Sequence, residues 1–312
     1  MNMKAAFVFP GQGSQSVGMM RSFADLAMVR ETFAEASHAV GDDLWKLVQD
    51  GPADALSLTI NTQPVMLAAD IALYRAWKSN YGTLPIVAAG HSLGEYSALV
   101  AGDAMDFAEA VSLVRYRAQA MQEAVPENVG AMAAILGLED AEVEDSCAEA
   151  SEAGQTVEAA NFNSPAQVVI AGHKGAVERA MDIAKGKGAK RAIMLPMSVT
   201  SHCSLMRPAA ERMRERLKSV AIRMSTVPVL HNATVRSASS VQDLRDALVR
   251  QLYQPVRWVD TIRAMVSAGA THIVECGPGK VLAGLNKRIA PETPVISFAD
   301  ESAFQAALIA LK

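Results

Sequence analysis

A serine in a glycine-rich turn is the residue of this sequence whose surroundings best suit chemistry. Gly90, Ser92 and Gly94 form a Gly-x-Ser-x-Gly pattern between an apolar, strand-like run and a helix-like stretch. In that context the pattern is typical of a nucleophile elbow, where the serine oxygen projects from a sharp turn. The backbone N–H of Leu93 would then lie at a helix N-terminus, where it can stabilise an oxyanion. The alternative is a structural turn with a helix-capping serine.

A serine nucleophile needs a base, and histidine is the usual one. Among six histidines, His202 and His231 follow strand-like segments, whose loops often carry active-site groups. Spacing does not choose between them, and for either one a structural histidine is the more ordinary interpretation. No aspartate stands out as the third member of a triad. Cys203 is a rival nucleophile, although no elbow presents it.

Two other glycine-rich segments follow strand-like runs but match no nucleotide-binding fingerprint. Ser16 replaces the third glycine of a dinucleotide loop that would begin at Gly11. Val274 replaces the first glycine of a P-loop that would end with Lys280. Each segment fits either a loop that approaches a ligand closely or a plain turn at the end of a strand.

Two long helices are predicted after the first strand. The first is apolar nearly all round, with Asn61 or Thr62 as its cap and Pro64 in its first turn. Such a helix is buried. The second spans residues 106–125 and ends before Pro126.

Arg115 and Arg117 lie on the two flanks of the apolar stripe of the second helix. A flanking arginine usually extends to solvent, but its planar fork can also enter a pocket and bind a carboxylate. Periodicity leaves this choice open for both residues.

Short apolar runs alternate with helical stretches, which is typical of an α/β protein with a largely parallel sheet. We expect a large α/β-hydrolase-like domain formed by residues 1–127 and 199–312. Residues 128–198 show the order βαββαβ, which is that of a ferredoxin-like domain, and we interpret them as an insertion. The strand-like runs are residues 5–9, 84–89, 168–171, 192–195, 227–230, 272–276 and 295–298.

The composition fits a soluble globular protein. Of 312 residues, 50% are hydrophobic and 20% charged, and the net charge of −4 argues against a nucleic-acid partner. Three separated cysteines predict neither a disulfide framework nor a structural metal site. No apolar run is long enough for a membrane span or a signal peptide. We therefore expect a cytoplasmic protein with no bound metal and no membrane contact.

Four motifs in this order resemble those of the malonyl-CoA:acyl carrier protein transacylases, the stand-alone acyltransferases of bacterial fatty-acid synthesis. They are FPGQGSQ, GHSLGEYSAL, VRYRAQAMQ and SHCSLM. NFNSPAQVVIAG and VECGPGKVL extend the likeness essentially from end to end. The resemblance implies that Ser92 is the nucleophile, that His202 is its base and that Arg117 binds a carboxylate. It also implies an oxyanion hole at the backbone N–H groups of Gln12 and Leu93.

The resemblance also assigns three glutamines and removes one histidine from consideration. Gln63 and Gln167 are implied to line the pocket. A backbone carbonyl near Gln251 is implied to orient the base in place of a triad acid. His231 has no role in the family pattern and is expected to be structural or on the surface.

The implied reaction transfers malonyl from malonyl-CoA to the phosphopantetheine thiol of acyl carrier protein through a malonyl-serine, without a cofactor and in a monomer. A discrete acyltransferase of a polyketide synthase would share every motif. A serine hydrolase or thioesterase would have a triad acid and no ferredoxin-like insertion, and a non-catalytic binding module would form no acyl-serine. Basic clusters at residues 185–191 and 207–218 are either solvated faces or docking surfaces for the acidic carrier protein.

Overall fold

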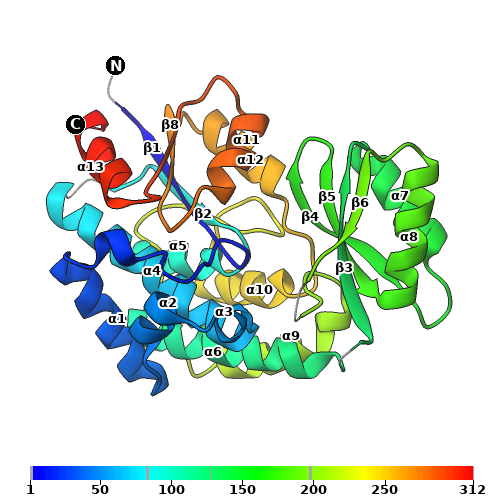
Figure 1. Ribbon diagram of the computed structural model, residues 1–312, viewed down its shortest axis with the longest axis horizontal. Coiled ribbons are helices and arrows are strands. Elements are labelled where there is room, and N and C mark those ends of the chain that lie inside the picture. Colours follow the sequence, from blue (N-terminus) through cyan, green and yellow to red (C-terminus); the bar gives the residue numbers. More distant parts are fainter. Residues whose placement is uncertain (1–2, 82–83, 127, 197–198, 312) are drawn as a thin grey trace.

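Two sheets organise the molecule, whose computed structural model describes residues 3–81, 84–126, 128–196 and 199–311. The larger sheet has five strands in the order β7-β2-β1-β8-β9, and the smaller has four in the order β4-β5-β3-β6 (Figure 1). Described pairings are parallel in the larger sheet and antiparallel in the smaller. The predicted fold class, an α/β domain with a smaller inserted one, is confirmed.

The parallel sheet brings the chemically interesting loops to one edge. Because its strands run in the same direction, the loops that leave the carboxyl ends of β1, β2 and β8 converge there. These loops are the elbow and the two glycine-rich segments. The strands are β1 Ala5–Phe9, β2 Val87–Gly90, β7 Val229–Leu230, β8 His272–Glu275 and β9 Val295–Ser297.

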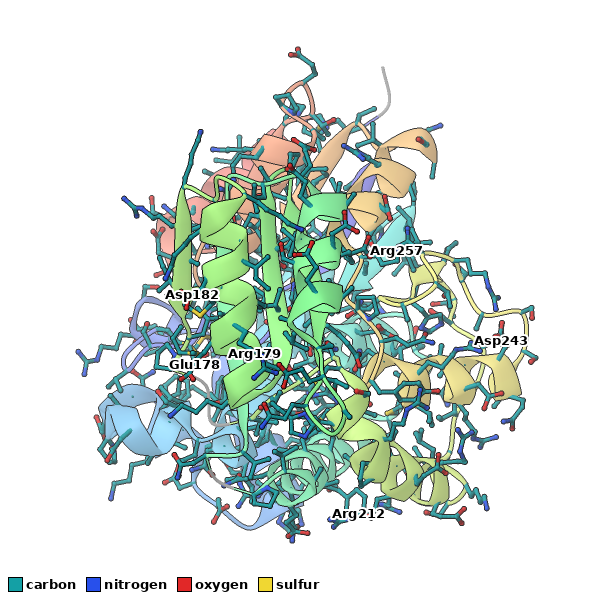
Figure 2. All side chains as sticks on the ribbon, turned by 90° about the vertical axis from the view of Figure 1, so that its right-hand side faces the viewer. Glu178, Arg179, Asp182, Arg212, Asp243 and Arg257 are labelled. Carbon is teal, nitrogen blue, oxygen red and sulfur yellow. The ribbon has the colours of Figure 1, made fainter. Side chains whose placement is uncertain are left out.

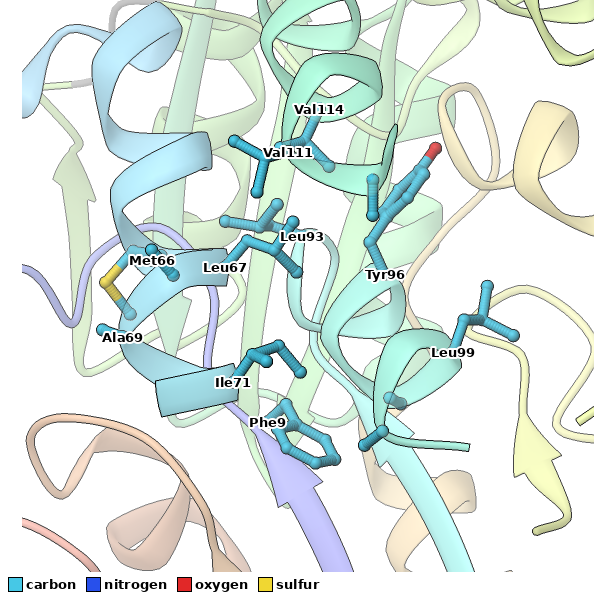
Figure 3. Packing of buried hydrophobic residues seen from close by; sticks show 14 of the residues in the cluster. Phe9, Met66, Leu67, Ala69, Ile71, Leu93, Tyr96, Leu99, Val111 and Val114 are labelled. Carbon is cyan, nitrogen blue, oxygen red and sulfur yellow. The ribbon is translucent and has the colours of Figure 1, made fainter. Parts of the chain in front are cut away.

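Helices cover both faces of this sheet, as the alternation of side chains along β1 requires. Phe7 and Phe9 pack into one apolar cluster, whereas Ala6 and Val8 pack into another. Figure 3 shows Phe9 beneath residues of the helices on its face, including Leu93 of the elbow. The helices on this face include α1 Ala27–Val40, α4 Thr59–Tyr81, α5 Gly94–Ala101 and α6 Phe107–Ala124. The other face is covered by α11 Trp258–Ser267 and α12 Val281–Ile289.

The remaining helices of the larger domain lie around this framework (Figure 1). They are the 3-10 turns η1 Arg21–Phe23 and η2 Ser204–Met206, and the α-helices α2 Leu44–Asp50, α3 Ala53–Ser57, α9 Arg207–Leu217, α10 Val241–Gln251 and α13 Glu301–Ala310. Within the described ranges, no helix is long and apolar enough to cross a bilayer.

The start predicted for α4 is wrong. The helix begins at Thr59, so Pro64 lies inside it and not in its first turn. A proline has no N–H to donate to the carbonyl four residues earlier, which here belongs to Ile60. Arg115 Nη1 of α6 donates to that carbonyl at 3.2 Å. This substitute donor allows the helix to contain a proline.

The smaller domain has the predicted βαββαβ order. Its helices cover the outer face of its sheet (Figure 2), and Met132, Val169 and Ala171 pack with Cys203 on the inner face. Backbone bonds of Val256 to Ala160 and Phe162, each 2.9 Å, join it to the larger domain. The expected boundary residues 127 and 198 lie outside the described residues, so that division stays a prediction. The elements are β3 Gly130–Leu136, α7 Asp140–Ala150, β4 Val157–Ser164, β5 Gln167–His173, α8 Lys174–Gly186 and β6 Arg191–Met194.

Candidate active site

Ser92 occupies the tight turn between β2 and α5 in a conformation that serine rarely adopts. Its φ is +52°, in the left-handed region. Both of its backbone polar groups are held by side chains from distant segments. Asn232 Oδ1 accepts the Ser92 N–H at 2.7 Å, and Gln251 Nε2 donates to the Ser92 carbonyl at 2.8 Å. These bonds help to hold a strained residue in place.

The two flanking glycines are required by close backbone approach. A Cβ on Gly90 would lie 1.8 Å from the carbonyl carbon of Gly94. A Cβ on Gly94 would lie 2.0 Å from the carbonyl oxygen of Phe9. Any side chain at either position would therefore displace backbone and open the turn that presents Ser92.

His202 lies beside Ser92 in the geometry of a general base. Its Nε2 is 2.8 Å from Ser92 Oγ, and its Nδ1 is 2.7 Å from the backbone oxygen of Gln251. Because a carbonyl only accepts, Nδ1 carries the hydrogen and Nε2 is free to take the serine proton. Burial, assisted by the positive charge of Arg117, lowers the pKa of His202 to about 3. The imidazole is consequently neutral near pH 7, as a base must be.

The two rival residues left open by the sequence are placed elsewhere. His231 is buried, and its Nδ1 lies 2.8 Å from Glu95 Oε1, so it is structural and not on the surface. Cys203 is 1% exposed, and burial raises the pKa of its thiol to about 12. A buried thiol of this kind is inert near neutral pH.

Arg117 points into the site, whereas Arg115 does not. The side chain of Arg117 is buried: Nη1 donates to Gln63 Oε1 at 2.8 Å, and Nη2 donates to Ser92 Oγ at 3.2 Å and Gln251 Oε1 at 2.9 Å. Arg115 instead pairs with the carboxylate of Asp42 on the opposite flank of α6. The Arg117 cation thus lies against Ser92 Oγ, where it can bind an anionic group.

A cavity of about 260 Å³ opens above Ser92 between the two domains. Among the described residues, the backbone N–H groups of Gln12 and Leu93 have no hydrogen-bond acceptor, and both residues line this cavity. Two free N–H donors beside a serine nucleophile are what an oxyanion hole provides. The full lining is Gln12, Gly13, Gln63, His91, Ser92, Leu93, Arg117, Met121, Met132, Asn161, Asn163, Val169, Leu195, Val199, Ser201 and His202.

The arrangement of serine, base and free N–H groups is suited to acyl transfer, and comparison with known proteins agrees. The model of the acyl transferase domain family matches residues 6–292. This chain belongs to the acyl transferase family. The Malonyl CoA-acyl carrier protein transacylase of Escherichia coli strain K12 is 54% identical over 304 residues, covering 97% of this acyl transferase and 98% of the relative.

Solved structures resemble this acyl transferase throughout its length. The crystal structure of acyl-carrier-protein S-malonyltransferase from Burkholderia pseudomallei has a TM-score of 0.96 at 56% identity, covering 98% of this chain and 100% of that one. A malonyl-transacylase in complex with its type II polyketide synthase acyl-carrier protein has a TM-score of 0.97 at 47% identity. The match covers 98% of this chain and 99% of that one. The fold of this acyl transferase therefore has close counterparts among solved structures.

One glutamine expected in the pocket of the acyl transferase lies elsewhere. Gln167 begins β5, and its Oε1 accepts a hydrogen bond from Ser164 Oγ at 3.2 Å across the hairpin. It is not among the residues that line the cavity. The smaller domain contributes Asn161 and Asn163 instead, and Asn163 Oδ1 accepts from His91 Nε2 at 2.8 Å.

Three polar groups around the elbow were not anticipated as parts of the site. They are the carboxylate of Glu95, the side chain of Asn232 and the amide of Gln251. Glu95 follows the elbow directly and Asn232 follows β7, so proximity to a strand end was the available signal for both. In the described residues, no group of three or more His, Cys, Asp or Glu side chains could hold a metal ion.

Proposed function

We propose that this acyl transferase moves a malonyl group from malonyl-CoA to the phosphopantetheine thiol of acyl carrier protein, and so supplies fatty-acid chain elongation. The observation that carries the proposal is the buried Arg117 cation, 3.2 Å from Ser92 Oγ. In a malonyl thioester, one methylene separates the carboxylate from the reacting carbonyl. A cation beside the nucleophile therefore selects and orients this acyl group. The names of the relatives and solved structures support the same substrate.

In the first half-reaction, His202 Nε2 takes the proton of Ser92 Oγ, and that oxygen bonds to the thioester carbonyl carbon. The N–H groups of Gln12 and Leu93 stabilise the resulting oxyanion. Collapse of this intermediate breaks the carbon–sulfur bond, and CoA leaves as a thiol with the proton from His202. Arg117 holds the malonyl carboxylate throughout.

In the second half-reaction, the carrier protein's thiol gives its proton to His202, and its sulfur bonds to the ester carbonyl. The ester bond then breaks, and Ser92 Oγ recovers the proton. Water in the same position would hydrolyse the ester. The cavity between the domains limits the access of water while malonate occupies it.

The proposal is tested by mixing the protein with malonyl-CoA and measuring its mass. We expect one malonyl adduct, on the peptide that contains Ser92, and its loss when phosphopantetheinylated acyl carrier protein is added. Absence of an adduct, or its release to water at the same rate with or without carrier protein, would contradict the proposal. The second outcome would favour a thioesterase.

A second candidate function is malonyl transfer to the carrier protein of a polyketide synthase. The structural similarity to a type II polyketide transacylase favours it. Relative rates of malonyl transfer to carrier proteins of the two pathways distinguish the candidates. A serine hydrolase is less well supported, because the base is oriented by a backbone carbonyl and the chain carries the antiparallel insertion.

Docking of an acidic carrier protein is proposed at Lys190 and Arg191. The ion pairs of the described residues include neither side chain, and both residues are exposed. By contrast, Arg212 of α9, labelled in Figure 2, pairs with Glu123 at 2.6 Å. Unpaired cations attract an acidic partner more strongly than neutralised ones. β6 begins with Arg191 and ends one residue before Leu195, which lines the cavity.

The protein is also proposed to act as a cytoplasmic monomer without a cofactor. One chain supplies the nucleophile, the base, the arginine and the free N–H groups of the site. The proposed chemistry needs only proton transfer and acyl exchange. Light scattering of the active protein, which should give the mass of one chain, tests the oligomeric state.

A further inference from the structure

Glu95 is a buried carboxylate close behind the nucleophile. It lies in the first turn of α5 and is fully buried. Its Oε1 is bonded to His231 Nδ1 at 2.8 Å, and its Oε2 accepts from the Asn232 backbone N–H at 2.9 Å and from Gln251 Nε2 at 3.0 Å. Nitrogen donors on both oxygens suit an ionised carboxylate.

The amide of Gln251 lies between this anion and the Arg117 cation. Its Oε1 accepts from Arg117 Nη2 at 2.9 Å, while its Nε2 donates to Glu95 and, at 2.8 Å, to the Ser92 carbonyl. Turning the amide by 180° would place NH₂ against the guanidinium and oxygen against two acceptors. All three contacts would become repulsive, so the charges on either side fix the orientation of the amide.

We propose that Glu95 is a positioning residue for the acyl transfer proposed above, acting through the Gln251 amide and Asn232. Through Gln251 it holds the carbonyl of Ser92 and one donor of Arg117. Through the backbone of Asn232 it holds the side chain whose Oδ1 accepts the Ser92 N–H and whose Nδ2 donates to the Gly90 carbonyl at 2.6 Å.

Glu95 also balances a buried charge. Burial lowers the pKa of Arg117, and the negative charge of Glu95 opposes that shift. A carboxylate that never touches substrate thus supports both the conformation of the nucleophile and the cation that binds the malonyl group. Its loss should harm malonyl transfer more than transfer of an acyl group without a carboxylate, since only malonyl uses the arginine.

The test compares Glu95→Gln with Glu275→Gln in single-turnover acylation of Ser92 by malonyl-CoA and by acetyl-CoA. Glu275 is an equally buried carboxylate, but it accepts from the backbone N–H groups of Leu282 and Ala283 at the start of α12. We expect Glu95→Gln to slow malonylation about 10- to 100-fold, the range set by loss of a charge-assisted hydrogen bond, and acetylation less. Glu275→Gln should lower Tm and leave the malonyl-to-acetyl ratio unchanged.

A double-variant cycle with Gln251→Ala shows whether Glu95 acts through the amide. If it does, the losses are not additive, and the double variant is about as slow as the slower single variant. Should Glu95→Gln fail to fold, Glu95→Asp replaces it. Its carboxylate is one methylene shorter and draws back from Gln251, so the same fall in ratio is expected.

An unchanged malonyl-to-acetyl ratio in the folded Glu95 variants, or additive losses in the cycle, would overturn the positioning role. The unmutated protein is the internal reference. If it forms no malonyl-serine, the proposed function has failed. If the unmutated protein forms malonyl-serine and the Glu95 variants have the same malonyl-to-acetyl ratio as that protein, only the inference about Glu95 has failed.

Discussion

The Arg117 side chain should decide which acyl groups this enzyme accepts. Arg117→Ala removes the guanidinium, whose planar fork can present two N–H groups to a malonyl carboxylate. A hydrogen bond to a charged group is worth about 1.5–3 kcal/mol, so a two-pronged contact is worth about 3–6 kcal/mol. At about 1.4 kcal/mol per factor of ten, kcat/KM for malonyl-CoA should fall about 10²- to 10⁴-fold.

Acetyl transfer should lose far less, because acetyl has no carboxylate. Both reactions share the cost of leaving Gln63 Oε1 and Gln251 Oε1 without their donor, and of losing the 3.2 Å contact with Ser92. The informative quantity is therefore the ratio of kcat/KM for malonyl-CoA to kcat/KM for acetyl-CoA, in which this shared cost cancels.

The chain supplies a matched control on the same helix. Arg115→Ala also removes an arginine from α6, but one that binds Asp42, Asn61 and the Ile60 carbonyl. It should lower Tm without changing the ratio. Equal losses for the two acyl groups in Arg117→Ala would refute the reasoning and make Arg117 a structural residue.

Four further outcomes are expected. Ser92→Ala should retain the fold and form no malonyl adduct by mass spectrometry; an adduct on Cys203 would show the wrong nucleophile has been identified. His202→Ala should slow malonylation by about 10²-fold or more. In the wild type the pKa of His202 is lowered to about 3, so the rate of malonylation should stay level from pH 8 to pH 5 instead of falling near pH 6.5. The double variant Lys190→Glu/Arg191→Glu should raise KM for carrier protein, and the increase should shrink at high salt. Malonylation of Ser92 by malonyl-CoA should be unchanged. An unaltered KM would show that carrier protein docks on another surface.

Local patterns predicted the elbow and the order of the inserted domain, because both arise from neighbouring residues. The start of α4 was misjudged for the opposite reason. Pro64 is tolerated inside the helix because Arg115, from another helix, satisfies the Ile60 carbonyl. No property of the sequence around residue 64 reveals that donor.

The site itself depends on contacts between distant parts of the chain. His202 is 110 residues from Ser92, so spacing could not select it over His231, and the family resemblance was needed. The Gln251 side chain reaches Ser92 across 159 residues, and no local signal marks its amide. Resemblance also misplaced Gln167, because motif matching does not show which way a side chain on a strand edge points.

The packing around a glycine determines whether a second substitution can compensate for its replacement by alanine. The Cβ of an alanine at residue 90 would collide with the backbone of Gly94, and no second substitution removes a backbone carbonyl. At residue 102 the collision would be with Ser225 Oγ at 2.1 Å, which Ser225→Ala would remove. In a screen for malonyl-serine formation, Ser225→Ala should therefore rescue Gly102→Ala. Gly90→Ala should be rescued in the same screen only by a return to glycine at residue 90.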